Sequence, residues 1–106
     1  PKDIQAKLNV ARALASSPRL LLLDKPTNGM NQEQAQDFML VLEMINRKYR
    51  TAIIIIENEI DLIANICTQI SVMEYGTIIA TDTPEVIRSN SILRAIYLGE
   101  KLGGKS

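Results

Sequence analysis

The chain has 106 residues, of which 46% are hydrophobic, and this size suits one domain with an apolar core. Its 12 basic and 12 acidic residues cancel, so no net field directs it to nucleic acid or to anionic lipid. It contains no histidine, which excludes imidazole catalysis and histidine metal sites, and its single cysteine excludes an internal disulfide. No apolar run approaches the roughly 20 residues of a membrane span, and no signal peptide is visible, so we expect a soluble, cytoplasmic protein.

The first residues predict a helix followed by a strand. Apolar residues, Ile4 and Leu8 among them, recur at helical spacing over residues 2–16, and a Ser-Ser-Pro sequence ends this pattern. Residues 20–23 are four consecutive leucines, which predict a buried strand. Pro26 ends the strand, because proline has no N–H to donate to a neighbouring strand.

The next segment repeats this order of helix and strand. Asn31 is expected to cap a helix that runs to about Lys48, with Gln34 as its capping-box partner. Residues 51–56 are apolar and largely β-branched, which favours a parallel strand covered on both faces. Strands that alternate with helices predict a parallel sheet with right-handed crossovers.

The remaining pattern consists of short elements. We expect a short helix, a two-stranded hairpin that turns at Tyr75-Gly76, and two further helices. In chain order, these elements occupy residues 59–67, 70–73, 77–80, 84–89 and 91–98. We treat residues 1–98 as a single α/β domain and residues 99–106 as a flexible Gly-rich tail.

Asp24 is the first candidate for chemistry, because it stands where the strand at 20–23 ends. In open α/β sheets, ligands bind at the carboxyl ends of the strands. A carboxylate at that place is therefore a candidate for Mg²⁺ and phosphate chemistry.

The residues around Asp24 carry a family resemblance. Residues 20–27 read Leu-Leu-Leu-Leu-Asp-Lys-Pro-Thr, with Ala-Arg-Ala-Leu at 11–14 before them and Asn-Gly-Met-Asn at 28–31 after them. This stretch resembles the Walker B region of an ATP-binding cassette (ABC) ATPase. Three later segments are similar to the C-terminal end of ATP-binding subunits of branched-chain amino acid importers; they occupy residues 76–80, 83–88 and 95–100.

The resemblance implies a particular α/β fold. It is a mainly parallel sheet with flanking helices, a partial RecA-like (P-loop NTPase) cassette that lacks the Walker A strand, with a short C-terminal hairpin and helices. In such a cassette the missing strand lies beside the strand at 51–56, so apolar sheet edges would be exposed. We therefore expect the isolated chain to self-associate or to rearrange.

The resemblance also implies roles for single residues. Asp24 occupies the position that holds Mg²⁺ through water, and Asn31 occupies the D-loop position. Lys25 stands where the family has its catalytic glutamate, and Asn58 stands where it has its switch histidine. An ammonium group has no lone pair to accept a proton from the attacking water, so no active catalytic residue is expected.

The two phosphate-contacting motifs of the family are altered or misplaced. Its signature sequence S-G-G-Q corresponds here to Pro-Lys-Asp-Ile at 1–4, which retains nothing of it. Residues 99–106 match G-x-x-x-x-G-K-[ST] formally, which makes Gly104, Lys105 and Ser106 candidate phosphate-binding residues. That motif requires a strand before it and a helix after it, so a flexible tail is the favoured interpretation.

Two functions from different classes remain open. The first is a fragment or derivative of the ATP-binding subunit of an ABC amino acid importer, unable to hydrolyse ATP alone. The second is a non-enzymatic or engineered α/β scaffold or association module with no nucleotide function. By resemblance the cofactor is Mg-ATP and the partner is a membrane permease subunit at the inner membrane, although we expect this chain to bind no nucleotide. Self-association is expected, and a nucleic-acid partner is not.

Overall fold

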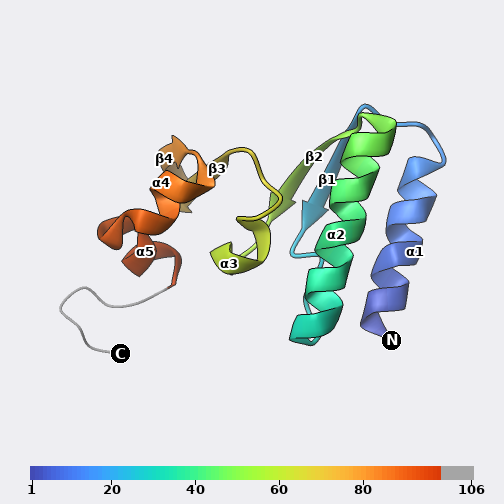
Figure 1. Cartoon of the computed structure of the whole chain (residues 1–106), viewed down its shortest axis with the longest axis horizontal. Coiled ribbons are helices and arrows are strands. Elements are labelled where there is room, and N and C mark those ends of the chain that lie inside the picture. Colours follow the sequence, from blue (N-terminus) through green and yellow to red (C-terminus); the bar gives the residue numbers. More distant parts are fainter. Residues whose placement is uncertain (99–106) are drawn as a thin grey trace. The chain divides into compact units, whose positions relative to one another are not determined.

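The structure is a computed structural model that describes residues 1–98 (Figure 1). Its contacts divide the chain into two compact units, Pro1–Glu57 and a second unit that begins at Asn58. The elements in chain order are α1 (Lys2–Leu14), β1 (Leu20–Asp24), α2 (Gln32–Tyr49), β2 (Ala52–Ile56), α3 (Ile60–Ile63), β3 (Ile70–Glu74), β4 (Thr77–Asp82), α4 (Pro84–Ser89) and α5 (Ser91–Tyr97). The assignment of residues 1–98 to a single domain stays a prediction, and the tail at 99–106 lies outside the described residues.

In the first unit, β1 and β2 form a parallel pair in continuous register from Leu20–Ala52 to Asp24–Ile56. A parallel pair needs a crossover connection, and α2 supplies it between the two strands. Helix α2 packs against β2, and α1 packs against α2 (Figure 1). The predicted order of helix and strand is confirmed over this unit.

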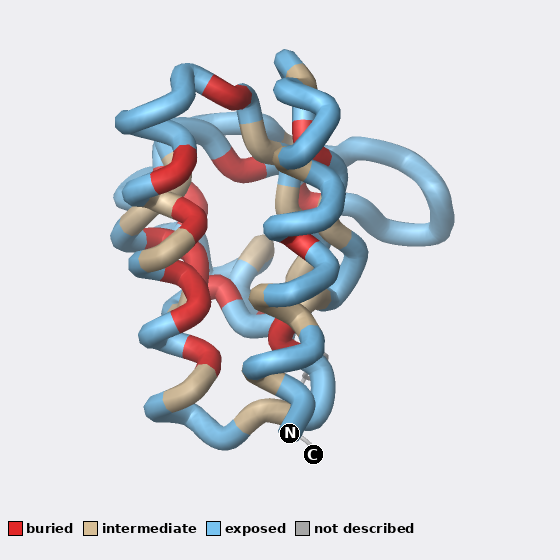
Figure 2. Tube along the Cα trace, turned by 90° about the vertical axis from the view of Figure 1, so that its right-hand side faces the viewer, coloured by how far each residue is buried: buried red, intermediate tan, exposed pale blue. Residues whose placement is uncertain are grey.

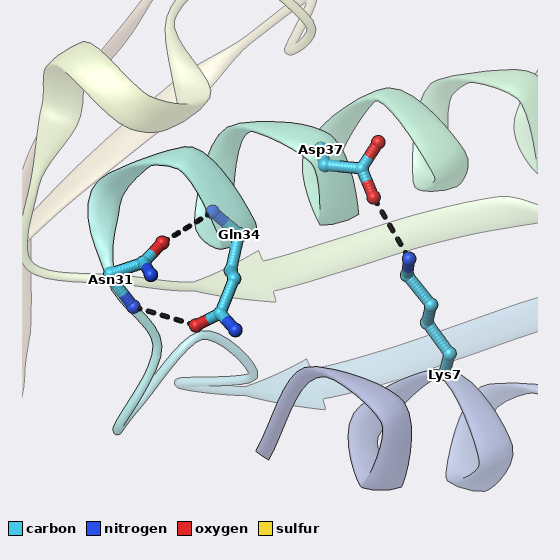
Figure 3. A network of polar contacts seen from close by, with 4 residues as sticks. All are labelled: Lys7, Asn31, Gln34 and Asp37. Atoms are coloured by element: carbon cyan, nitrogen blue, oxygen red, sulfur yellow. Dashed lines mark hydrogen bonds and ion pairs between the residues drawn. The ribbon is translucent and has the colours of Figure 1, made fainter. Parts of the chain in front are cut away.

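Helix α2 begins and ends with local signals in the sequence. The N–H of Gln34 donates to Oδ1 of Asn31 at 2.8 Å, and the N–H of Asn31 donates to Oε1 of Gln34 at 3.0 Å, which confirms the predicted capping box (Figure 3). The helix ends at Arg50, whose φ of 59° is left-handed. Its buried side chains recur on one side of the helix (Figure 2). They are Ala35, Phe38, Met39, Leu42 and Ile45.

An ion pair joins the two helices of the first unit. Nζ of Lys7 on α1 donates to Oδ2 of Asp37 on α2 at 2.8 Å (Figure 3). This hydrogen bond raises the pKa of the Lys7 ammonium from its ordinary value of 10.5. Because both groups are on the surface, solvent screens the pair, and it orients α1 on α2 more than it stabilises the unit.

Two burial expectations for the first unit are wrong. Residues 20–23 were expected to form a buried strand, yet Leu20 and Leu22 of β1 are exposed. Strand β2 was expected to be covered on both faces, yet Ile54 and Ile56 are exposed. The physical reason is that α2 packs against β2 and α1 packs against α2, so that within this unit the strand face opposite Leu21 has no cover. In α1, the apolar residues Ile4 and Leu8 are exposed, and Val10 is the buried residue.

The second unit is built around an antiparallel hairpin, as predicted. Strands β3 and β4 pair across a two-residue turn in which Tyr75 and Gly76 have φ values of 50° and 78°. Two successive residues with positive φ define the type I′ turn that suits the twist of a hairpin. A bulge between Val72 and Met73 shifts the register of the pair.

Short helices complete the second unit. Helix α3 spans only Ile60–Ile63, shorter than the expected 59–67, while α4 begins at Pro84 with Thr83 as its N-cap. The buried residues of this unit come from α3, β3, α4 and α5 and include Ile60, Ile63, Ile70, Val72, Ile87 and Ala95. A small α/β chain with a parallel strand pair, flanking helices and a later hairpin is therefore confirmed. Over residues 1–98, the model contains no helix both long and apolar enough to cross a bilayer.

Candidate functional site at the carboxyl end of the parallel strands

Strands β1 and β2 end at the same edge, so the residues that follow them are neighbours. Asp24 is paired with Ile56 at the last position of the register. Beyond it, the N–H of Lys25 donates to the carbonyl of Ile56 at 2.8 Å, which continues the ladder by one step. The parallel register therefore brings together three charged residues at this edge, Asp24 and Lys25 after β1 and Glu57 after β2.

Glu57 holds the loop that follows β1. Its Oε2 accepts from Oγ1 of Thr27 at 2.8 Å and from the N–H of Thr27 at 3.2 Å. Thr27 is buried, so these are hydrogen bonds to a charged acceptor that is partly protected from water. Thr27 was not among the candidate residues, although it is the last residue of the stretch at 20–27 that resembles the Walker B region.

The loop between β1 and α2 is a tight series of turns. The N–H of Asn28 donates to the carbonyl of Lys25 at 3.2 Å, and the N–H of Met30 donates to the carbonyl of Thr27 at 3.0 Å. Lys25 has a φ of 46°, which is strained for a residue with a side chain. Gly29 has a φ of 86°, and a Cβ at this position would lie 3.1 Å from Cγ of Lys2, so the loop needs glycine here.

Asn31, the candidate at the D-loop position, is engaged by the fold. Its Oδ1 accepts the N–H of Gln34 and caps α2. The side-chain oxygen therefore acts as the N-cap of α2, and this role alone explains an asparagine at position 31.

Asp24 and Lys25 both carry exposed side chains at the edge. Mg²⁺ prefers oxygen ligands and commonly uses one or two carboxylates together with phosphates and water, and Asp24 matches that chemistry as a single ligand. Among residues 1–98, however, no three Asp, Glu, Cys or His side chains gather into a group that could hold a metal ion. At this edge Asp24 is therefore the one exposed carboxylate, beside the Lys25 ammonium, while Glu57 accepts hydrogen bonds from Thr27.

The remaining candidates lie elsewhere. Asn58 is exposed and is the first residue of the second unit, so its assignment to the switch-histidine position stays a prediction. Gly104, Lys105 and Ser106 lie outside the described residues. Cys67 is half-buried, and burial raises the pKa of its thiol from 9.0, which leaves it protonated and unreactive at neutral pH.

Comparison with solved structures defines the class of protein. The chain superimposes on cbiO1 from Clostridium perfringens, part of the ABC transporter complex cbiONQ, with a TM-score of 0.71 and 29% identity. The match covers 84% of this chain and 36% of that one. The partial P-loop NTPase fold expected from the sequence is thereby confirmed.

Comparison with curated proteins narrows the class. The chain is 33% identical over 96 residues to the high-affinity branched-chain amino acid transport ATP-binding protein LivG of Escherichia coli K12, a match that covers 91% of this chain and 38% of LivG. It is 36% identical over 84 residues to the methionine import ATP-binding protein MetN of Mannheimia succiniciproducens, covering 79% of this chain and 24% of MetN. None of the protein-family models compared with the sequence matches it.

Over the matched residues, the chain is therefore similar to ATP-binding subunits of ABC transporters, and these include ATP-binding proteins of branched-chain amino acid transport. The chain spans about two fifths of the length of LivG (38%).

Proposed function

We propose that the chain corresponds to the C-terminal part of the ATP-binding subunit of an ABC amino acid importer and that it does not hydrolyse ATP by itself. The observation that supports this proposal is Lys25 at the end of β1, which stands where the family that the sequence resembles has its catalytic glutamate. The surrounding residues keep the pattern of that edge, from the leucine run to the loop held by Glu57.

The proposed inactivity follows from the chemistry of the three charged residues. Asp24 can hold Mg²⁺ through water, but it has no second carboxylate to act on a water molecule. The Glu57 carboxylate already accepts two hydrogen bonds from Thr27 and holds the loop after β1, so we do not assign it the role of general base. The Lys25 ammonium can attract phosphate but cannot accept a proton. No catalytic step is therefore assigned to these residues.

Mg-ATP is the cofactor of the family by resemblance, and we propose that this chain alone binds none. In the family that the sequence resembles, the signature sequence contacts phosphate through backbone N–H groups at the start of a helix. The corresponding start of α1 carries Lys2 and Asp3 in place of glycines, and a carboxylate there opposes the approach of a phosphate.

The proposed partner and cellular location follow from the same family resemblance. The ancestral role would couple ATP binding to amino acid import through a membrane permease subunit, at the cytoplasmic side of the inner membrane. Within that role, the loop after β1 and the exposed end of α1 would be the parts that face nucleotide.

The second candidate is a non-enzymatic association module, and the exposed face of the strand pair favours it. Four large aliphatic side chains of β1 and β2 are exposed on that face. A chain that keeps its fold but not its chemistry can still function by binding another protein surface.

An amide-correlation NMR titration with Mg-ATP tests the proposal. We expect a dispersed spectrum that Mg-ATP leaves unchanged, both in the wild type and in the Asp24→Asn variant. Shifts that are confined to the residues around Asp24 in the wild type, and that disappear in Asp24→Asn, would show a surviving nucleotide site and overturn the proposed inactivity.

A further inference from the structure

The charges of the first unit are divided unevenly between its two ends, although charge cancels over the whole chain. The C-terminal ends of α1 and α2 lie at the same end of this unit as the starts of β1 and β2 (Figure 1). Two contacts hold this end together. The N–H of Ala52 donates to the carbonyl of Arg19 at 3.0 Å, and Oγ1 of Thr51 donates to the carbonyl of Pro18 at 3.4 Å.

Five exposed basic side chains gather at this end. Three lie in the last turns of α1 and α2, and two lie in the connections that lead into β1 and β2. We name these residues the basic end: Arg12, Arg19, Arg47, Lys48 and Arg50. Residues 8–23 and 38–52 build this end, and their one acidic residue is Glu43, which pairs with Arg47 at 3.5 Å. The rest of the unit, by contrast, has more acidic than basic residues.

We propose that the basic end docks on the surface of a membrane that contains anionic lipid. Anionic headgroups attract a cluster of about four to eight Lys or Arg residues through their summed field, and each basic residue near the surface strengthens binding roughly fivefold. The basic end lies within that range. The proposal does not depend on nucleotide binding, because the basic end is at the opposite end of the strands from Asp24.

The backbone at the basic end favours a diffuse charged surface over a single bound phosphate. Both helices present their C-terminal carbonyl groups here, and the negative end of a helix dipole opposes a phosphate at close range. The two dipoles offset about one unit of charge, which leaves the basic end clearly positive. Its field acts on a charged surface without close coordination of any one phosphate.

The neighbouring side chains favour lipid over nucleic acid. Tyr49 (57% exposed) lies between Lys48 and Arg50 in the chain, and Leu20 (48% exposed) follows Arg19. Tyrosine and apolar side chains beside cations suit the interface of a membrane. Single-stranded nucleic acid would instead stack its bases on an aromatic ring. Nζ of Lys48 lies 5.5 Å from the ring centroid of Tyr49 and covers one face of this ring.

Flotation with lipid vesicles tests the proposal on the wild type. Vesicles of phosphatidylcholine and phosphatidylglycerol in equal parts should carry the chain, and vesicles of phosphatidylcholine alone should not. Binding should be lost between about 0.1 M and 1 M salt, because the Debye length falls from about 10 Å to about 3 Å. Failure to bind the anionic vesicles at low salt, or equal binding to both kinds of vesicle, would overturn the proposal.

Two matched double variants locate the surface. Arg19→Gln with Arg50→Gln removes two cations from the basic end and should weaken binding to the anionic vesicles roughly 25-fold. Lys2→Gln with Lys25→Gln makes the same change of net charge at the other end and should weaken it less than about twofold. The 18 residues of α2 separate the two ends by about 27 Å, well beyond a Debye length of about 8 Å. Equal losses would show that net charge alone drives binding and would overturn the proposal.

Two further measurements test the orientation and the partner. A nitroxide-labelled lipid should broaden the amide signals of residues 47–50 and leave those of residues 2–5 sharp; the reverse pattern would overturn the proposal. Single-stranded polyuridine serves as the nucleic-acid probe and should bind less tightly than the anionic vesicles at equal phosphate concentration. Tighter binding to polyuridine would assign the basic end to nucleic acid and overturn the assignment to lipid.

Discussion

Of the four large side chains that are fully buried among residues 1–98, Phe38, Met39 and Leu42 belong to α2 in the first unit, and Ile87 belongs to α4 in the second. Helix α2 has 18 residues and presents one apolar side to the strands. The second unit has helices of four, six and seven residues. Helices this short are not stable alone, so the second unit depends on its caps, on its hairpin and on the contacts that α4 and α5 make with each other and with the hairpin.

The difference shows how two apolar patterns lead to different kinds of core. One long amphipathic helix gives the first unit a concentrated core but covers one sheet face only. Several short elements give the second unit a dispersed core. The residues expected to carry nucleotide chemistry at the strand edge belong to the unit with the concentrated core.

The largest effect is expected from Phe38→Ala. Phe38 is fully buried, and removal of a buried Phe side chain costs about 3–5 kcal/mol. Hydrogen exchange should show loss of amide protection in residues 1–57, with protection in the second unit retained. Met44→Ala, on the same helix but exposed, is the control and should have little effect. Equal loss of protection in both units would show that they fold as one.

Ile87→Ala is the corresponding change in the second unit. Ile87 is also fully buried, and its truncation should cost about 2–5 kcal/mol. Protection should now be lost in residues 58–98. The neighbouring exposed Val86→Ala serves as the control. If Ile87→Ala proves as mild as Val86→Ala, the second unit has no core of its own.

Thr27→Val tests the loop at the strand edge. The variant keeps the shape of the side chain but removes the hydroxyl that donates to Glu57, so unfolding free energy should fall by about 1.5–3 kcal/mol. Urea denaturation measures the change. The Glu57→Gln variant keeps an oxygen that can accept both hydrogen bonds. Its unfolding free energy should therefore fall by less than that of Thr27→Val, which provides the comparison. A Thr27→Val protein as stable as the wild type would mean that the hydrogen bond does not hold the loop.

A smaller gain is expected from relief of backbone strain at Lys25. Its φ of 46° costs a residue with a Cβ about 1–2 kcal/mol, a cost that glycine avoids. Glycine loses more conformational entropy on folding, however, and this loss cancels part of the gain in stability. Lys25→Gly should therefore raise the unfolding free energy by about 1 kcal/mol. Lys25→Ala removes the charge but keeps the strain, and thermal denaturation should find it close to the wild type. Stabilisation by Lys25→Ala would point to charge as the cause.

The smallest effect is a pH dependence at Cys67. Burial raises the pKa of the folded-state thiol above 9.0, so the unfolded chain loses its proton first as the pH rises. The contribution of this group to stability is complete below pH 9.0 and declines as the pH rises through the folded-state pKa. Alkylation rates measured against pH should have a higher midpoint for the folded chain than for the chain in urea. Identical midpoints would show that the thiol is not protected.

Much of the fold could be predicted from local sequence signals. The Asn31–Gln34 capping box, the Tyr75-Gly76 turn and the start of α4 at Pro84 were each identified correctly, because they depend on neighbouring residues. The order of strands and helices followed from apolar periodicity in the same way. Asp24 was located at a strand end for the same reason.

The sequence by itself therefore determined the order of the helices and strands and the resemblance to ABC ATP-binding subunits, because both depend on short segments of neighbouring residues. The tertiary structure alone decided which faces are covered, because the same apolar run in β2 fits a strand with helices on two sides or on one. It also decided that Thr27 and Glu57, 30 residues apart, hold one loop, since only the parallel register of β1 and β2 brings them within 2.8 Å.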